Sequence, residues 1–163
     1  MVLLADGADA LWRRLPAQVP LGCRRIEILD FYHAAEHVVT GAKALVGEQA
    51  GQHLGAAWRR RLKAGEVDGV IGDLAGRLAE AVDPKAATDT LAYLRTHRHR
   101  MGYLERRLDG YQIGSGTIES WCKQMLRRVR GAGMRWSEDG LEAVLALRCR
   151  LLEDDWNRRA FAA

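Results

Sequence analysis

The sequence has few cysteines and no long apolar run, the features that stabilise small secreted proteins and membrane proteins respectively. Among its 163 residues are only three cysteines, Cys23, Cys122 and Cys149, which are far apart and form no CxxC pair. The sequence therefore indicates neither a disulfide framework nor a cysteine zinc site. No run approaches the roughly 18 apolar residues that a membrane helix requires, and the N-terminus lacks the basic and apolar regions of a secretory signal. We expect a cytoplasmic protein with reduced thiols that does not enter a membrane.

Positive charge is concentrated in one part of the chain. The whole sequence has 25 Lys and Arg against 21 Asp and Glu, for a net charge of +4. Between Arg95 and Arg135, however, ten Lys or Arg residues accompany only three acidic residues. Such a block indicates either a solvated charge run or a surface that binds nucleic acid.

Two short apolar runs, each ended by an aspartate, predict buried strands. Val2–Ala5 is followed by Asp6 and Gly7, and Ile26–Leu29 is followed by Asp30. Because a short helix over 9–15 fits between them, we expect a strand, crossover, strand unit with parallel pairing.

The rest of the chain has the spacing of helices, so the fold class is α/β but mostly helical. Helices are expected at 31–47, 52–64, 67–78 and 116–130. A further helix should start at Asp83-Pro84, with Leu91, Leu94 and Met101 on one face, and Ser137 should cap the last one. The last of these has an apolar stripe made of Leu141, Val144, Leu145, Arg148, Leu151 and Leu152. Two short parallel strands are only marginally stable as a sheet by themselves. We therefore expect further strands, supplied by another chain or by the rest of a longer protein.

The stretch 113–136 combines a glycine-rich turn, an acid and several cations. Gly114, Ser115 and Gly116 predict a turn into a helix, and Gly131 and Gly133 its end. On one continuous helix, Glu119, Lys123, Arg127 and Arg130 would share a stripe. That stripe is either a solvated face with an internal ion pair or a carboxylate that holds a metal beside a phosphate backbone.

Ligands of open α/β sheets bind beyond the carboxyl ends of the strands, where Asp6 and Asp30 lie. Each aspartate could instead start a turn or cap the next helix. Whether Glu119 joins them is not determined by spacing.

Four ordered blocks resemble the C-terminal half of a group of bacterial insertion-sequence transposases. They are ILDFYHAAEH (28–37), YLRTHRHRMGY (93–103), IGSGTIESWCK (113–123) and GAGMRW (131–136). These transposases look like members of the DDE superfamily, whose ribonuclease-H-like core carries a helical insertion between the second acid and the glutamate.

The resemblance implies a division of the chain into three parts. Residues 1–33 would be a partial ribonuclease-H-like core, 34–110 the helical insertion, and 111–163 the C-terminal helices of the core that carry the catalytic glutamate. The first acid of the triad would lie on a strand before Met1. We therefore expect a truncated transposase or one part of a split gene, inactive alone.

The same resemblance assigns the site residues. Asp6 matches the second acid and Glu119 the third, and together they would bind Mg²⁺ or Mn²⁺ for DNA strand cleavage and strand transfer. Asp30 and His33 would brace the site or approach DNA. The basic positions that would contact phosphates of the insertion-sequence ends and the target DNA are Lys123, Arg127, Arg128, Arg130 and Arg135. Self-association is also implied.

Two alternatives are kept open. The chain could be a DNA-binding or interaction fragment without catalysis, which would be indifferent to divalent metal. His33, Glu36 and His37 also match the H-x-x-E-H pattern of inverted zinc peptidases, with a third ligand from Glu48 or Glu66. His97 and His99 lie in a basic stretch and are interpreted as phosphate neighbours or solvated groups.

Overall fold

The computed structural model describes residues 1–127 and 129–152 and divides the chain into two compact units. The first unit is Met1–Ser115 and the second is Gly116–Ala163. Each unit is described by itself.

The first unit begins with the predicted strand, crossover, strand motif. Strands β1 (Val2–Ala5) and β2 (Ile26–Leu29) pair in parallel, with Val2 opposite Ile26 and Ala5 opposite Leu29. Helix α1 (Asp9–Arg14) and the 3₁₀ helix η1 (Leu15–Gln18) form the connection. Trp12 anchors α1, because its indole is buried and its Nε1 donates a hydrogen bond to the Asp6 carbonyl at 2.7 Å. Both strands and their parallel pairing confirm the prediction.

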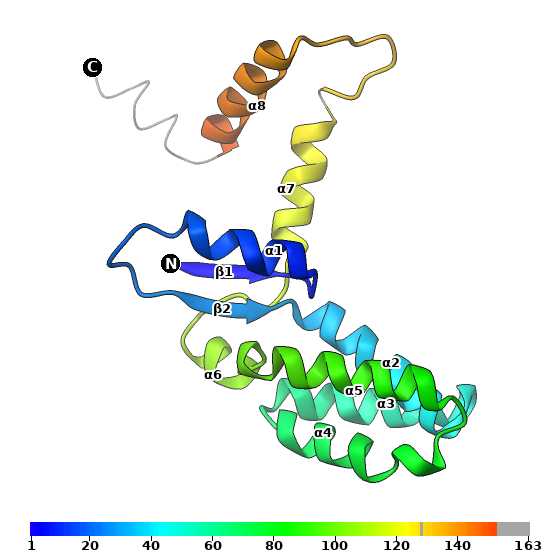
Figure 1. Ribbon diagram of the computed structural model, residues 1–163. Helices are drawn as coiled ribbons and strands as arrows, with labels where there is room; N and C mark the ends of the chain where they lie inside the picture. The colour runs from blue at the N-terminus through cyan, green and yellow to red at the C-terminus, as the bar shows by residue number, and fades with distance from the viewer. Residues whose placement is uncertain (128, 153–163) are drawn as a thin grey trace. The chain divides into compact units, whose positions relative to one another are not determined.

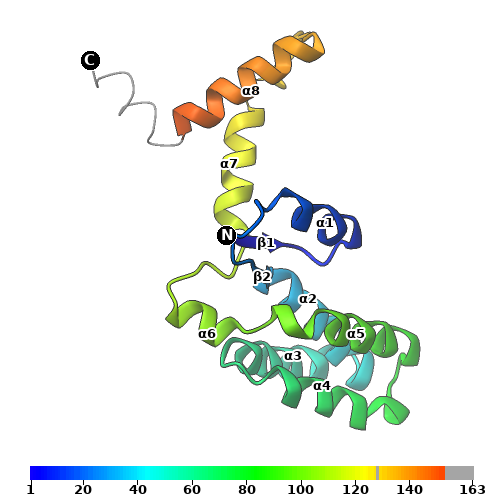
Figure 2. The same ribbon diagram turned by 60° about the vertical axis from the view of Figure 1, so that its left-hand side comes forward.

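The remainder of this unit is helical, and within it the structure describes no further strand. Helices α2 (Phe31–Val46), α3 (Glu48–Lys63), α4 (Val67–Gly76) and α5 (Pro84–His97) pack together beyond the end of β2 (Figures 1 and 2). The shorter elements are η2 (Leu78–Glu80), η3 (Arg98–Arg100) and α6 (Tyr103–Leu108).

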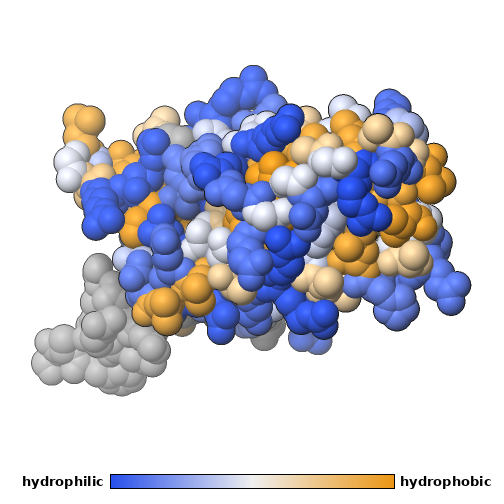
Figure 3. Space-filling view, turned by 90° about the horizontal axis from the view of Figure 1, so that it is seen from below, coloured by the Kyte–Doolittle hydropathy of each residue, from blue (hydrophilic) through white to orange (hydrophobic). Residues whose placement is uncertain are grey.

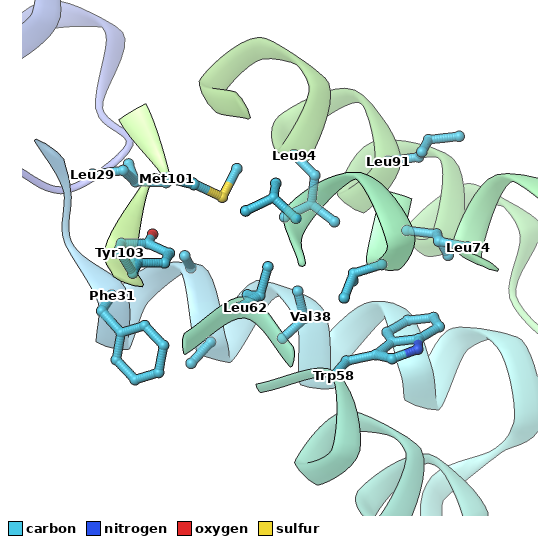
Figure 4. Packing of buried hydrophobic residues seen from close by; sticks show 14 of the residues in the cluster. Leu29, Phe31, Val38, Trp58, Leu62, Leu74, Leu91, Leu94, Met101 and Tyr103 are labelled. Carbon is cyan, nitrogen blue, oxygen red and sulfur yellow. The ribbon is translucent and has the colours of Figure 1, made fainter. Parts of the chain in front are cut away.

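Side chains from the strands and from most of these helices share one core (Figure 4). Its largest fully buried members include Trp58, Tyr103 and Ile28. Helices α2 and α3 approach especially closely, because a Cβ added to Gly51 would lie 2.4 Å from the Lys43 Cα, and one added to Gly55 would lie 2.9 Å from the Val39 Cα. Glycines at these positions therefore permit backbone-to-backbone packing.

Three details of the first unit differ from the prediction. The helix expected over 67–78 ends at Gly76, and Leu78 begins η2. Helix α3 begins at Glu48 rather than at residue 52, since Gly47, with φ of 83°, makes a one-residue break after α2. Met101 is fully buried, as Leu94 is, but it follows η3 and does not belong to the same helix as Leu91 and Leu94. The helix start at Asp83-Pro84 is confirmed, with the Asp83 carboxylate accepting from the Ala86 N–H at 3.0 Å.

The second unit contains α7 (Gly116–Leu126) and α8 (Glu138–Leu152). Ser137 caps α8 as predicted, because its Oγ accepts from the Gly140 N–H at 3.1 Å. Leu141, Val144, Leu145 and Arg148 are partly buried in agreement with the expected stripe, whereas Leu151 is 47% exposed and lies outside it. The Leu152 side chain lies outside the described set.

The long cationic helix face is a prediction that the structure corrects. Helix α7 ends at Leu126, so Arg127 and Arg130 are not on the same helix as Glu119 and Lys123. The helix tightens there, with the Val129 N–H bonded to the Leu126 carbonyl at 3.1 Å. The Val129 carbonyl accepts a hydrogen bond from the Trp136 indole at 3.0 Å.

Within the described ranges no helix is long and apolar enough to cross a membrane. Figure 3 shows one face of the molecule, where hydrophilic residues cover much of the surface and hydrophobic residues lie in separate groups between them.

Candidate functional site

Two aspartates lie at the same edge of the two-stranded sheet. Ala5 and Leu29 are register partners, and the next residue of each strand is Asp6 or Asp30. The structure therefore places both carboxylates at the carboxyl ends of parallel strands, where the sequence predicted them.

Asp30 is a buried carboxylate whose oxygens are already occupied. It is 1% exposed, and its Oδ1 accepts from the backbone N–H groups of Tyr32 at 2.7 Å and His33 at 3.0 Å, which caps α2. Its Oδ2 accepts from the backbone N–H of Ser115. Burial alone would raise the pKa of Asp30, but the hydrogen bonds from Ser115, His33 and Tyr32 outweigh that effect and hold the pKa below its usual value. Asp30 thus acts as a fixed anion that organises backbone.

That anion joins two segments that are distant in sequence. Beside the Asp30 to Ser115 contact, the Phe31 N–H donates to the Ile113 carbonyl at 2.8 Å. Gly114 packs flat against Tyr32, since an added Cβ would lie 2.6 Å from the Tyr32 ring. Residues 28–33 and 113–115 therefore form one junction, which is called the Asp30 junction below.

Asp6 differs from Asp30 in what its carboxylate can still bind. Its Oδ1 accepts from the Ala8 N–H at 3.0 Å, and Oδ2 has no hydrogen bond to any residue that the structure describes. The side chain is partly exposed. Asp6 therefore has the free oxygen that a hard divalent cation requires, whereas the oxygens of Asp30 are taken by N–H groups.

Two tyrosines lie behind these aspartates, and sequence reasoning missed both. The hydroxyls of Tyr93 and Tyr103 are buried and have no hydrogen-bond partner in the described part of the chain. Burial, followed by the negative charges of Asp6 and Asp30, raises the pKa of Tyr93 to about 12. A Cβ on Gly7 would lie 2.3 Å from the Tyr93 ring, so the glycine after Asp6 is what lets the tyrosine approach. In the sequence, these tyrosines stand out only as the first and last residues of the block 93–103.

Of the two histidines predicted to be solvated or near phosphate, His97 is buried and His99 is exposed. His97 is 3% exposed, and its Nδ1 lies 3.0 Å from Nη1 of Arg100. Burial, and next the charge of Arg100, lower the pKa of His97. His99 is exposed, with its Nε2 3.8 Å from the Glu27 carboxylate. The interpretation of His97 as a solvated group or phosphate neighbour is therefore wrong.

Arg100, which contacts His97, also contacts the strand–helix motif at the start of the chain. Its Nε donates to Glu27 Oε2 on β2 at 2.7 Å, and its guanidinium lies 4.0 Å from the Trp12 ring centroid. Arg100 thus ties the helical region to β2 and α1 by a charged hydrogen bond and a cation–π contact.

The remaining predicted site residues belong to the second unit. Glu119 and the four described cations are exposed there, namely Lys123, Arg127, Arg130 and Arg135. Arg128 lies outside the described residues. The structure does not determine the position of Glu119 relative to Asp6, so their assembly into one site stays a prediction.

Among residues 1–127 and 129–152, the H-x-x-E-H segment has no third ligand beside it. His37 stacks on Tyr93 at a centroid distance of 3.6 Å, and His33 Nδ1 lies 4.0 Å from Glu36 Oε2. The suggested third ligands are engaged elsewhere, Glu48 with Lys43 at 2.8 Å and Glu66 with Arg61 at 2.9 Å. Within the described residues no three His, Cys, Asp or Glu side chains are grouped as a metal site would require.

No protein-family model, no curated protein and no solved structure matches this chain.

Proposed function

We propose that this chain is part of a DDE transposase, an enzyme that cuts and joins DNA strands by metal-dependent phosphodiester chemistry. Its two parallel strands would belong to an incomplete ribonuclease-H-like core, with the helices of the first unit as the insertion. The observation that carries the proposal is the Asp30 junction. It brings together residues from two of the four blocks in which the sequence resembles such transposases, 28–37 and 113–123.

The division of labour between the aspartates follows from their contacts. Asp6 keeps a carboxylate oxygen free and would hold Mg²⁺ or Mn²⁺ together with Glu119. Asp30 uses its oxygens on backbone N–H groups and would brace the segment that leads to Glu119, with His33 beside it in α2. The bound metal would supply activation of the attacking oxygen and stabilisation of the leaving oxygen.

The exposed cations of the second unit would hold the DNA. Lys123 lies on α7, one turn after Glu119, and Arg127, Arg130 and Arg135 follow it as exposed side chains, with Arg128 between them in sequence. Exposed guanidinium and ammonium groups bind phosphate oxygens and fix the position of a duplex without reading its sequence. The partners would be the insertion-sequence ends and the target DNA.

Metal binding by Asp6 and Glu119 is the property to test first, because it does not require the fragment to be active alone. Titration of Mn²⁺ monitored by electron paramagnetic resonance should show bound metal in the wild-type chain and little in Asp6→Asn or Glu119→Gln. The same proteins should then be assayed for Mn²⁺-dependent nicking of supercoiled DNA.

Two exposed carboxylates outside the proposed site provide matched controls. Asp9→Asn in the first unit and Glu142→Gln in the second remove the same charge and should leave Mn²⁺ binding unchanged. If Asp6→Asn binds Mn²⁺ as tightly as Asp9→Asn does, the metal site is not at Asp6 and the catalytic proposal fails. DNA binding that is indifferent to Mn²⁺ in every variant would instead favour a non-catalytic DNA-binding fragment.

A further inference from the structure

A cationic groove runs between α2 and α3 beside the Asp30 junction. One hollow of about 440 Å³ is lined by residues that include Phe31, Val39, Arg59, Arg60 and Lys63. A second hollow of about 320 Å³ is also lined by Val39 and Arg59, and in addition by Tyr32, so the two lie next to each other. Tyr32 belongs to both the groove and the Asp30 junction.

The cations of the groove are free to bind a ligand. Arg59, Arg60 and Lys63 are exposed, and in the part of the chain that the structure describes no carboxylate forms an ion pair with any of them. Arg61 lies on another side of α3 and is the cation there that binds acids, Glu66 and Asp73. The lining contains one acid, Glu36, at the Tyr32 end. The groove therefore carries a net positive charge.

Two of these cations, Arg59 and Lys63, lie over aromatic rings of α2. The Arg59 guanidinium lies 5.8 Å from the Phe31 ring centroid and 6.0 Å from that of Tyr32, and the Lys63 ammonium lies 5.9 Å from Phe31. Cation–π contacts at exposed sites are weak, so they favour, without fixing, the positions of these two cations over the rings. Phe31 is buried, whereas Tyr32 is 56% exposed and presents a ring to solvent.

We propose that this groove binds a strand of nucleic acid, with Arg59, Arg60 and Lys63 on successive phosphates and the Tyr32 ring stacked on a base. Unpaired cations along a groove with an exposed aromatic ring are the combination by which proteins hold single strands without sequence preference. An acidic polypeptide would pair with the same cations, so binding of a poly-glutamate peptide in preference to a nucleic acid strand would overturn the proposal. The statement that the nucleic acid is DNA rests on the proposed function. The proposal that the groove binds a nucleic acid strand rests on the contacts given above and not on that function.

The test is the affinity of the purified chain for a fluorescein-labelled dT20 oligonucleotide, measured by anisotropy in EDTA over a series of salt concentrations. Each phosphate neutralised on a single strand contributes about 0.7 to the log–log salt slope. The triple variant Arg59→Gln, Arg60→Gln, Lys63→Gln should therefore lose about 2 from the magnitude of that slope. Tyr32→Leu should weaken binding about tenfold with the slope unchanged, as expected for the loss of one stacked base.

A charge-matched triple variant separates the groove from general positive charge. Arg14→Gln, Lys85→Gln and Arg107→Gln remove three exposed cations from α1, α5 and α6 and should leave most of the affinity intact. Equal losses in the two triple variants, or no effect of Tyr32→Leu, would overturn the proposal. Groove-dependent binding to phosphatidylserine vesicles without binding to dT20 would overturn it too.

The groove and the metal site can fail independently. Binding to dT20 is measured in EDTA, so its outcome does not depend on a metal at Asp6. A chain that shows groove-dependent binding but no Mn²⁺ site would retain the groove and lose the catalytic assignment.

Discussion

The carboxylate of Asp30 accepts a hydrogen bond from the backbone N–H of Ser115, a residue 85 positions further along the chain. The same carboxylate caps α2 through Tyr32 and His33. One buried side chain thus fixes both the start of the helical region and its return to the sheet.

Replacing Asp30 by alanine should lower the free energy of unfolding by about 2–4 kcal/mol, because a helix cap and a charged tertiary hydrogen bond are lost together. Urea unfolding followed by tryptophan fluorescence would measure the loss.

Asp83→Ala is the matched control, since Asp83 caps α5 through a single bond to the Ala86 N–H and has an exposed side chain. It should cost only about 1 kcal/mol, as N-cap removal usually does. Equal losses in the two variants would show that the contact with Ser115 contributes nothing.

The buried His97 should make the protein less stable in mild acid. Its pKa is lowered in the folded state by burial and by Arg100, with smaller lowering effects from His99 and His37 and a small opposing effect from the Asp9 carboxylate. Below the ordinary histidine pKa of 6.5 the unfolded chain therefore binds more protons. This contribution to stability is complete above about pH 6.5 and is lost as the pH falls toward the lowered value. Urea unfolding of wild type and His97→Gln between pH 4.5 and 8 should show a shallower acid slope in the variant.

His53→Gln, at an exposed position of α3, controls for the substitution itself. Part of the acid slope should survive in His97→Gln, because burial lowers the pKa of His37 as well. If wild type and His97→Gln lost stability in parallel, another group would be responsible.

Glycine should be required at position 51 and dispensable at position 72. In Gly51→Ala the new methyl group would meet the Lys43 backbone at 2.4 Å, which neither helix can avoid without moving apart, so we expect a loss of about 1–3 kcal/mol. Gly72 lies inside α4 with nothing within 4 Å of an added Cβ, so Gly72→Ala should gain about 0.5–1 kcal/mol. Thermal unfolding of both variants would decide, and similar shifts of the same sign would contradict the close packing of α2 and α3.

Local pattern was sufficient to predict the strands, most helices and the placement of Asp6 and Asp30. Val2–Ala5 and Ile26–Leu29 are short apolar runs with an aspartate after each, and the structure has both strands at those bounds. Asp83 and Ser137 were recognisable as caps because capping depends on residues three positions away.

Contacts between residues that are distant in sequence were not predictable from the same local signals. Nothing local to Tyr93 indicates that it packs on Gly7, and nothing local to Arg100 indicates that it binds Glu27 on β2. Nor does anything local to Val129 indicate that its carbonyl accepts a hydrogen bond from the side chain of Trp136, seven residues later. The role of Asp30 as a brace was likewise left open, since one aspartate after a strand can cap, coordinate or do both.

The contact between Asp30 and Ser115 and the packing of Gly51 against Lys43 also differ in the length of chain that must close before each can form. Helices α2 and α3 are consecutive and separated by Gly47 alone, so their packing closes almost no loop. The bond between Asp30 and Ser115 closes a loop of 85 residues, whose entropic cost must be met before the contact contributes. We therefore expect the helix pair to form early in the folding reaction and the Asp30 junction late. Weakening the junction should mainly shorten the lifetime of the folded protein, whereas disturbing Gly51 should mainly slow its formation.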